Sequence, residues 1–131
     1  MSLLLDTHIW IWSLMAPEKL SRRVVKSLEA TEADLWLSPI SIWELVMLVE
    51  RDRLFLDRPV DQWVRDAMTL APLREAPVTN EIALESRTIL LPHGDPADRL
   101  LAATARVLGL TLVTADERLL QGKGFSTLPN R

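Results

Sequence analysis

The sequence predicts a three-layer α/β/α domain with a mostly parallel central sheet. Short, continuous apolar runs, which are typical of strands buried on both faces, alternate along the chain with longer segments of helical periodicity. Strands separated by helices need crossover connections, which place neighbouring strands parallel. At 131 residues and 48% hydrophobic composition, the chain can form a core of its own. We therefore expect residues 1–131 to form one domain.

The expected strands are short. Residues 3–5 are three consecutive leucines, too few for a helix, and indicate a buried strand. Residues 110–113 form the clearest strand after the first. The full expected set is 3–5, 34–37, a weak strand within 73–78, 110–113 and 125–128.

The expected helices are marked by the residues at their ends. Ser38 and Asp95 are good N-caps, and each precedes a proline, which is favoured at the first helical position. Gly109 is a typical stop for the helix that begins at Asp95. We expect the helix after Ser38 to place Trp43 on its apolar side. The expected helices cover 21–32, 38–51, 60–70, a segment capped by Thr79, 95–108 and 115–120.

Composition excludes several classes of protein. Cysteine is absent, so disulfides and thiolate metal sites are excluded, and a reducing cytoplasm is the expected location. No apolar run approaches the roughly 20 residues of a membrane span, and no signal peptide is recognisable. The chain has neither a Gly-rich phosphate loop nor a nucleophile elbow. The formal net charge of −3 does not by itself indicate nucleic-acid binding.

Four acidic residues lie where predicted strands end or predicted helices begin. Asp6 directly follows the first strand, and Asp116 closely follows the strand at 110–113. Glu44 lies in SPISIWEL and Asp98 in DPADRLLAATA, each in the early part of a predicted helix. In an open parallel sheet, ligands collect beyond the carboxyl ends of the strands. We therefore expect the four carboxylates to converge there.

Converging carboxylates repel one another unless they share protons or bind a cation. Oxygen ligands without cysteine suit a hard ion, so Mg²⁺ is the expected cofactor and Mn²⁺ an alternative. Such an ion polarises a phosphate and lowers the pKa of a bound water. This chemistry hydrolyses phosphodiester bonds.

Each acid also has a purely structural explanation. Asp6 is a possible cap for a helix that begins at Thr7, and Ser41 with Glu44 matches a capping box. Asp95 is the expected N-cap of its helix, which makes Asp98 a first-turn acid that suits the helix dipole. A second possible capping box, Thr114 with Glu117, leaves Asp116 as another first-turn acid. The joint placement of the four, rather than any one of them, favours a site.

The histidines and tryptophans are ambiguous. His8 and His93 have no spaced partner, and imidazole is a poor Mg²⁺ ligand, so we expect structural roles for both. Tryptophans stack on bases in some nucleic-acid-binding proteins but more often form core or interface. The chain contains Trp10, Trp12, Trp36, Trp43 and Trp63.

Four segments, LLLDTHIWIW, SPISIWELVML, HGDPADRLLAATA and LVTADERLL, together resemble PIN-domain ribonucleases, in particular the VapC-type toxins of bacterial toxin–antitoxin pairs. The resemblance extends over residues 3–128. It implies an α/β/α PIN-like fold and metal-dependent cleavage of RNA. The acids of the family fall on Asp6, Glu44, Asp98 and Asp116. It also implies a homodimer and a cognate antitoxin that obstructs the site.

The resemblance also suggests roles for individual residues. Asp6 and Asp98 are the expected metal ligands, and Glu44 and Asp116 complete the cluster. The supporting residues are expected to be Thr114, which orients Asp116 or a water, Asp95, which caps a helix, and Arg99. We expect Arg99 either to hold the RNA backbone or to be a surface or dimer residue.

Two other functions stay open on the sequence alone. A receiver-type signalling domain also holds Mg²⁺ in an acidic pocket, but it needs paired acids after the first strand, where Asp6 is alone. A non-catalytic interaction module would use the acids only as caps and the tryptophans as a partner surface. The sequence does not identify the RNA, because RNA selectivity depends on surface shape and unpaired bases.

Overall fold

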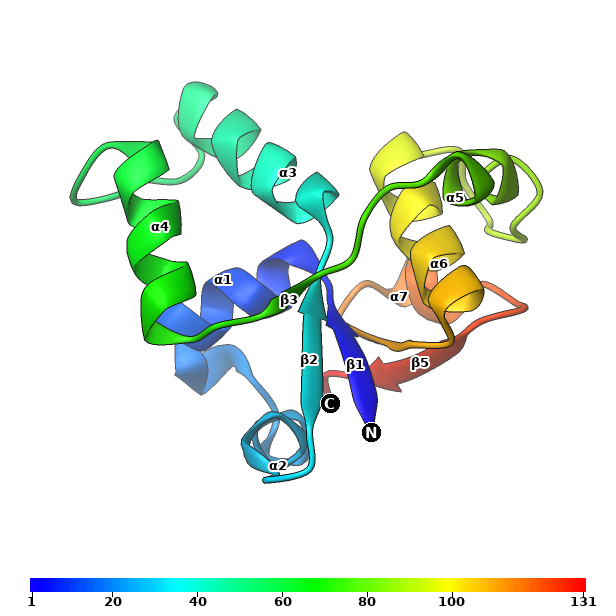
Figure 1. Ribbon diagram of the computed structural model, residues 1–131, viewed down its shortest axis with the longest axis horizontal. Coiled ribbons are helices and arrows are strands. Elements are labelled where there is room, and N and C mark those ends of the chain that lie inside the picture. The colour runs from blue at the N-terminus through cyan, green and yellow to red at the C-terminus, as the bar shows by residue number, and fades with distance from the viewer.

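The computed structural model describes residues 1–131 and has a five-stranded, all-parallel sheet at its centre (Figure 1). The strand order is β3-β2-β1-β4-β5, so β1 is central and pairs with both β2 and β4. The predicted α/β class and parallel sheet are confirmed. The strands are β1 (Ser2–Leu5), β2 (Asp34–Leu37), β3 (Arg74–Glu75), β4 (Thr111–Thr114) and β5 (Ser126–Pro129).

Four of the helices begin at the caps that the sequence predicted, whereas the helix at residues 7–15 was not among the expected ones. The side chains of Ser21, Ser38, Thr79 and Asp95 each accept hydrogen bonds from backbone N–H groups of the helix that follows. Gly109 ends its helix in the left-handed conformation, with φ 66°. None of the helices is both long and apolar enough to cross a bilayer. The helices are α1 (Thr7–Met15), α2 (Arg22–Glu29), α3 (Pro39–Glu50), α4 (Val60–Leu70), α5 (Asn80–Glu85), α6 (Pro96–Leu108) and α7 (Glu117–Leu120), with a 3₁₀ turn, η1, at Pro17–Lys19.

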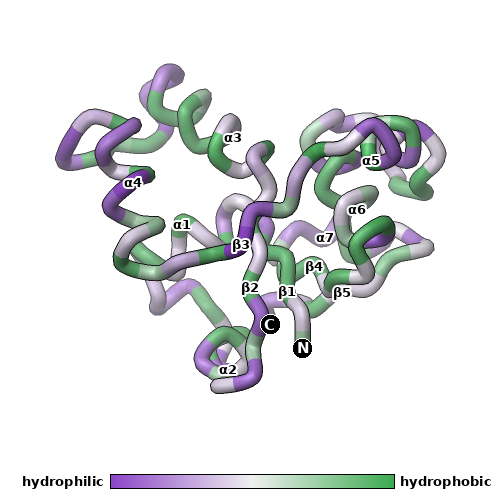
Figure 2. Tube along the Cα trace, in the orientation of Figure 1, coloured by the Kyte–Doolittle hydropathy of each residue, from purple (hydrophilic) through white to green (hydrophobic).

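Alternating side chains of the sheet enter two separate cores. Leu3 and Leu5 belong to one core together with residues of α1, α2 and α4, whereas Leu4 belongs to the other, with residues of α6. This alternation is the period-2 geometry of a strand buried on both faces. Figure 2 shows β1 as largely hydrophobic and the edge strand β3 as hydrophilic. The three-layer prediction is thus correct.

Helix α3 does not bury the side that the sequence suggested. Trp43 is 54% exposed, whereas Ser41 and Leu45 are fully buried. The helix contacts α1, α4 and α6, and the polar Ser41 packs against the start of α1. The expectation that Trp43 lies on the apolar face was wrong, because α3 is apolar nearly all round and tertiary contacts choose its buried face.

Candidate active site

All four predicted acids line one hollow at the carboxyl ends of β1 and β4. The hollow has a volume of about 370 Å³, and Asp95 also lines it. Its acids come from the β1–α1 junction, from α3, from the start of α6 and from the β4–α7 junction. The lining residues are Asp6, His8, Trp12, Glu44, Asp95, Asp98, Ala115, Asp116 and Arg118. The structure therefore brings together the carboxylates that the sequence placed at this edge.

Asp6 both caps α1 and faces the hollow. Its Oδ1 accepts a hydrogen bond from the Thr7 backbone N–H at 2.8 Å, and its Oδ2 accepts one from the Thr114 hydroxyl at 2.7 Å. The residue is 9% exposed, and this burial raises the pKa of the Asp6 carboxyl above its ordinary value. The hydrogen bonds oppose this rise, because they favour the ionised form.

Thr114 links Asp6 to Asp116. Its hydroxyl oxygen accepts a hydrogen bond from the Asp116 backbone N–H at 3.0 Å while its proton is donated to Asp6. Asp116 is itself the N-cap of α7 and accepts from the Arg118 N–H at 2.9 Å. The alternative capping box, Thr114 with Glu117, is therefore not formed. Thr114 instead spans two of the acids.

The Glu44 side chain is held in place by a hydrogen bond from Thr7, the first residue of α1. The Thr7 hydroxyl donates to its carboxylate and also lies 2.9 Å from the hydroxyl of the buried Ser41. Burial is the main cause that raises the pKa of Glu44, and the charge of Asp6 adds to it. The alternative capping box of Ser41 and Glu44 is not formed, because Ser38 caps α3.

Asp98 has the most perturbed carboxyl group of the hollow. Burial and, after it, the charges of neighbouring carboxylates raise its pKa to about 7. The neighbours are, in order of effect, Asp95, Asp6, Asp116 and Glu44. Asp95 is the N-cap of α6, as predicted, and accepts hydrogen bonds from the Ala97 and Asp98 N–H groups. The hollow thus holds more negative charge than its own polar contacts neutralise.

His93 and Arg118 are site residues whose contact with Asp98 the sequence did not reveal. The Nε2 of His93 lies 3.4 Å from Asp98 Oδ2 and has no hydrogen-bond partner, while its Nδ1 accepts from the Asp95 N–H at 3.1 Å. Because Nδ1 is an acceptor, Nε2 carries the proton and directs it towards Asp98. Arg118 Nη2 lies 3.9 Å from Asp98 Oδ2 and 3.5 Å from Asp116 Oδ2. The only sequence signal for either residue was its position two residues from a predicted acid.

The Arg99 guanidinium binds backbone carbonyls and is not placed to hold a phosphate in the acidic hollow. Its guanidinium donates to the backbone carbonyls of Ser86 and Ile89 at 2.7 Å each, and to that of His93 at 3.3 Å. It is not among the residues that line the hollow. These contacts tie the segment from α5 to α6 in place. Arg99 therefore positions the loop that carries His93.

The acidic side chains of the hollow are of the type that binds a hard cation, but they are not arranged as a complete metal site. In this arrangement no three acidic or histidine side chains lie close enough to bind a single ion. The carboxylate of Asp98 accepts no hydrogen bond, however, so little restrains it from turning towards Asp6. All the acids offer oxygen donors, which Mg²⁺ and Mn²⁺ prefer. The type of donor therefore suits a divalent ion, although the side chains are not gathered around a single point.

A parallel α/β/α sheet with carboxylates gathered where the strand order reverses defines an α/β protein with an acidic site at its topological switch point. The chain belongs to the PIN domain family, whose model matches residues 3–124. It is 36% identical over 121 residues to Ribonuclease VapC22 of Mycobacterium tuberculosis, which covers 90% of this chain and 89% of that protein.

Solved structures share the fold at lower sequence identity. VapBC2 from Rickettsia felis, bound to a DNA fragment from its promoter, matches with a TM-score of 0.72 and 17% identity over 98% of both chains. DNA-bound VapBC from Salmonella typhimurium matches with a TM-score of 0.69 and 18% identity, over 100% of this chain and 99% of that one. These likenesses confirm the predicted PIN-like architecture.

Proposed function

We propose that this protein is a divalent-metal-dependent endoribonuclease and the toxin of a type II toxin–antitoxin module. The observation that carries the proposal is the single hollow lined by Asp6, Glu44, Asp95, Asp98 and Asp116 in a chain of the PIN domain family. The similarity to a VapC ribonuclease supports RNA as the substrate. The likeness to VapBC complexes supports an antitoxin as partner.

Asp6 and Asp98 would hold the ion, and Glu44 and Asp116 would complete the cluster. A bound Mg²⁺ or Mn²⁺ would stabilise charge on the scissile phosphate and lower the pKa of the attacking water. Because the hydrogen bonds from Thr7 and Thr114 fix Glu44 and Asp6, these two carboxylates are oriented before substrate arrives.

Near Asp98, Arg118 contributes a positive charge and His93 contributes a hydrogen-bond donor. Arg118 is 57% exposed at its side chain and lies near two of the acids, so it can move from Asp116 to a substrate phosphate. The Nε2–H of His93 lies 3.4 Å from Asp98 Oδ2 and can donate to that carboxylate when it turns. Arg99, in contrast, acts through the loop it ties down rather than on RNA.

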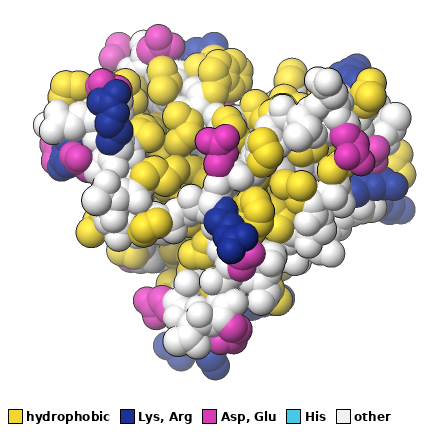
Figure 3. Space-filling model, viewed as in Figure 1, with side chains coloured by type: hydrophobic (Ala, Val, Ile, Leu, Met, Phe, Trp, Pro, Cys, Tyr) yellow, Lys and Arg dark blue, Asp and Glu magenta, His cyan; other side chains and the backbone are white.

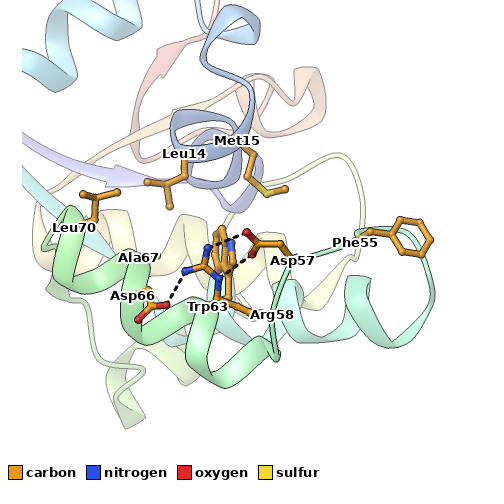
Figure 4. A pocket seen from close by; sticks show the side chains of 9 residues that line it. All are labelled: Leu14, Met15, Phe55, Asp57, Arg58, Trp63, Asp66, Ala67 and Leu70. Carbon is orange, nitrogen blue, oxygen red and sulfur yellow. Dashed lines mark hydrogen bonds and ion pairs between the residues drawn. The ribbon is translucent and has the colours of Figure 1, made fainter.

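Two hollows outside the acidic one, each lined in part by hydrophobic side chains, support the proposal of protein partners. One, of about 570 Å³, lies between α3, α4 and β3, where Figure 3 shows hydrophobic side chains gathered on the surface. The other, of about 440 Å³, lies between the end of α1 and α4, and Figure 4 shows Arg58 beside it, paired with Asp57 and Asp66. Exposed apolar surfaces of this kind typically mark protein interfaces. A cognate antitoxin and a second subunit are the partners we propose for them.

The receiver-type alternative gains no support from the geometry. Such a domain would also have a lysine after a late strand, but Lys123, which follows α7 and forms a backbone bridge with Leu90, precedes β5 and does not line the acidic hollow. A phosphorylation assay with a small phosphodonor is expected to leave the protein unmodified.

The decisive experiment compares the wild type with Asp98→Asn on labelled RNA. The wild type should cleave in Mg²⁺ or Mn²⁺ and stop in EDTA, and Asp98→Asn should be inactive yet folded. Asp61→Asn, at an exposed acid on α4, is the matched control and should retain activity. Inducing the same three chains in cells and sequencing RNA ends would identify the target. Equal cleavage by the wild type and Asp98→Asn would refute the assignment.

A further inference from the structure

A second hollow adjoins the acidic one and shares three of its lining residues. Its volume is about 240 Å³, and His8, Glu44 and Asp95 line both hollows. Its own residues include Trp43, Arg51 and Arg53. An occupant of this second hollow therefore lies directly beside the candidate catalytic carboxylates.

Trp43 offers an unburied aromatic ring at this position. It is 54% exposed and directly precedes Glu44 on α3, a helix that buries only Ser41 and Leu45. An indole exposed to this extent gains little from the core, and its flat face is free to stack on a nucleobase. Base stacking on an aromatic side chain tolerates any base, since every base has a π-face.

Arg51 and Arg53 supply positive charge at the end of the same helix. The chain leaves α3 through a Schellman motif, in which the Arg53 N–H donates to the Leu48 carbonyl at 2.9 Å and the Asp52 N–H to the Val49 carbonyl at 3.1 Å. This turn returns the chain towards the hollow. Of the ion pairs in the structure, none involves Arg51 or Arg53. Both guanidinium groups are therefore free to bind a phosphate.

We propose that the second hollow binds one unpaired nucleotide of single-stranded RNA next to the scissile phosphate. Trp43 stacks on the base, and Arg51 and Arg53 hold a flanking phosphate. This inference rests on the proposed ribonuclease function and adds the site that seats its substrate. The alternative occupant is a protein segment, because Trp43 also borders the α3–α4 hollow. The two unpaired arginines favour the nucleic acid.

The first test measures binding of a fluorescein-labelled single-stranded RNA in an Asp98→Asn background, which keeps the RNA intact. Stacking on an aromatic side chain contributes about 1–3 kcal/mol per base, so Trp43→Ala should weaken binding by about 5- to 150-fold. Trp43→Phe should retain most of the affinity. Leu84→Ala, at an apolar α5 side chain that is 75% exposed, is the control and should bind as the background does. Circular dichroism checks that each variant is folded.

The second test uses the salt dependence of the same binding. Neutralising one phosphate of a single strand contributes about 0.7 to the slope of log K against log salt. Arg51→Gln and Arg53→Gln should each weaken binding and reduce the slope, and the double variant should reduce it by about 0.7, the contribution of the one phosphate that they share. Arg87→Gln, at an exposed arginine outside both hollows, should change neither.

The outcomes of these tests distinguish a failure of the proposed nucleotide site from a failure of the proposed ribonuclease function. If Trp43→Ala binds RNA like Leu84→Ala while the wild type still cleaves RNA in a metal-dependent way, the subsite is wrong and the ribonuclease stands. If Trp43→Ala instead lowers the mass of the assembly in light scattering without weakening RNA binding, the hollow is a protein interface and the inference also fails. If the wild type neither binds nor cleaves RNA, both proposals fail.

Discussion

The two carboxylate oxygens of Asp6 accept hydrogen bonds from different elements. One bond comes from the next residue, Thr7, and is the ordinary capping contact that sequence reasoning considered. The other comes from Thr114, which is 108 residues away along the chain. A cap is a local property and can be predicted, whereas a contact across the sheet depends on which strands are neighbours. Asp6 is therefore both the N-cap of α1 and a lining residue of the acidic hollow.

We predict that Thr114→Val destabilises the protein and lowers its activity. Valine has nearly the same shape but leaves Asp6 Oδ2 and the Asp116 N–H without their partner. The expected loss is about 1–3 kcal/mol of unfolding free energy, measured in urea, together with slower RNA cleavage. Thr114→Ser keeps the hydroxyl and should behave like the wild type. Equal behaviour of the valine and serine variants would show that the hydroxyl has no such role.

We predict that Asp98 makes the metal-free protein less stable as the pH rises. Its folded pKa of about 7 lies above its ordinary value of 3.8, so the folded chain binds this proton more tightly than the unfolded chain does. The resulting stability is complete below the unfolded pKa and is lost as the pH rises through about 7.

Unfolding in EDTA between pH 4 and 8 measures this effect. Asp6 and Glu44 also have raised pKa values and act in the same direction, so the comparison with Asp98→Asn isolates the one group. The variant cannot ionise at this position and should lose less stability over this range. Parallel curves for the two proteins would contradict the prediction.

Helix α3 shows that the ends and the middle of an element depend on different information. Its start was predicted from Ser38 and Pro39, because capping involves only neighbouring residues. Its buried face was not, because an almost uniformly apolar helix has no periodicity that selects a side. Its end is set by Asp52, a non-glycine residue with φ 55°. The expected end near residue 51 agrees with the structure, and aspartate is among the few non-glycine residues that adopt the left-handed conformation readily.

We predict that Asp52→Gly stabilises the protein. Glycine adopts a positive φ without the steric penalty that a Cβ brings, and the change should raise the unfolding free energy by about 0.5–1 kcal/mol. The reverse change at the end of α6, Gly109→Ala, should lower it by about 1 kcal/mol, since φ there is 66° and no atom crowds the added Cβ. Denaturant titrations of both variants test the pair. A destabilising Asp52→Gly would mean that the aspartate makes a compensating interaction.

At the scale of the whole molecule, the sheet order decides where the acids meet. Because β1 lies between β2 and β4, the segments that leave these three strands at their carboxyl ends emerge side by side. The carboxylates of the hollow come from the β1–α1 and β4–α7 junctions, from α3, which follows β2, and from the start of α6. Burial, and after it the closeness of the other carboxylates, raises the pKa of Asp98.

We predict that Mn²⁺ or Mg²⁺ raises the melting temperature of the wild type. An ion that binds only the folded state stabilises it by about 2.7 kcal/mol at 100 times its Kd. Asp6→Asn and Asp98→Asn should show much smaller shifts in differential scanning calorimetry, and Asp61→Asn should match the wild type. A non-catalytic interaction module would give no metal-dependent shift in any of them.

The order of amino acids was enough to predict the α/β class, the five strands, most of the helices, four of the N-caps and the acids at strand ends and helix starts, but not helix α1. These features depend on periodicity and on contacts between neighbouring residues, which the order of amino acids contains. Tertiary structure alone decided the Thr114 bridge between Asp6 and Asp116, the approach of His93 and Arg118 to Asp98, and the exposure of Trp43 beside Arg51 and Arg53. These contacts join residues that become neighbours only when the strands pair and the helices pack.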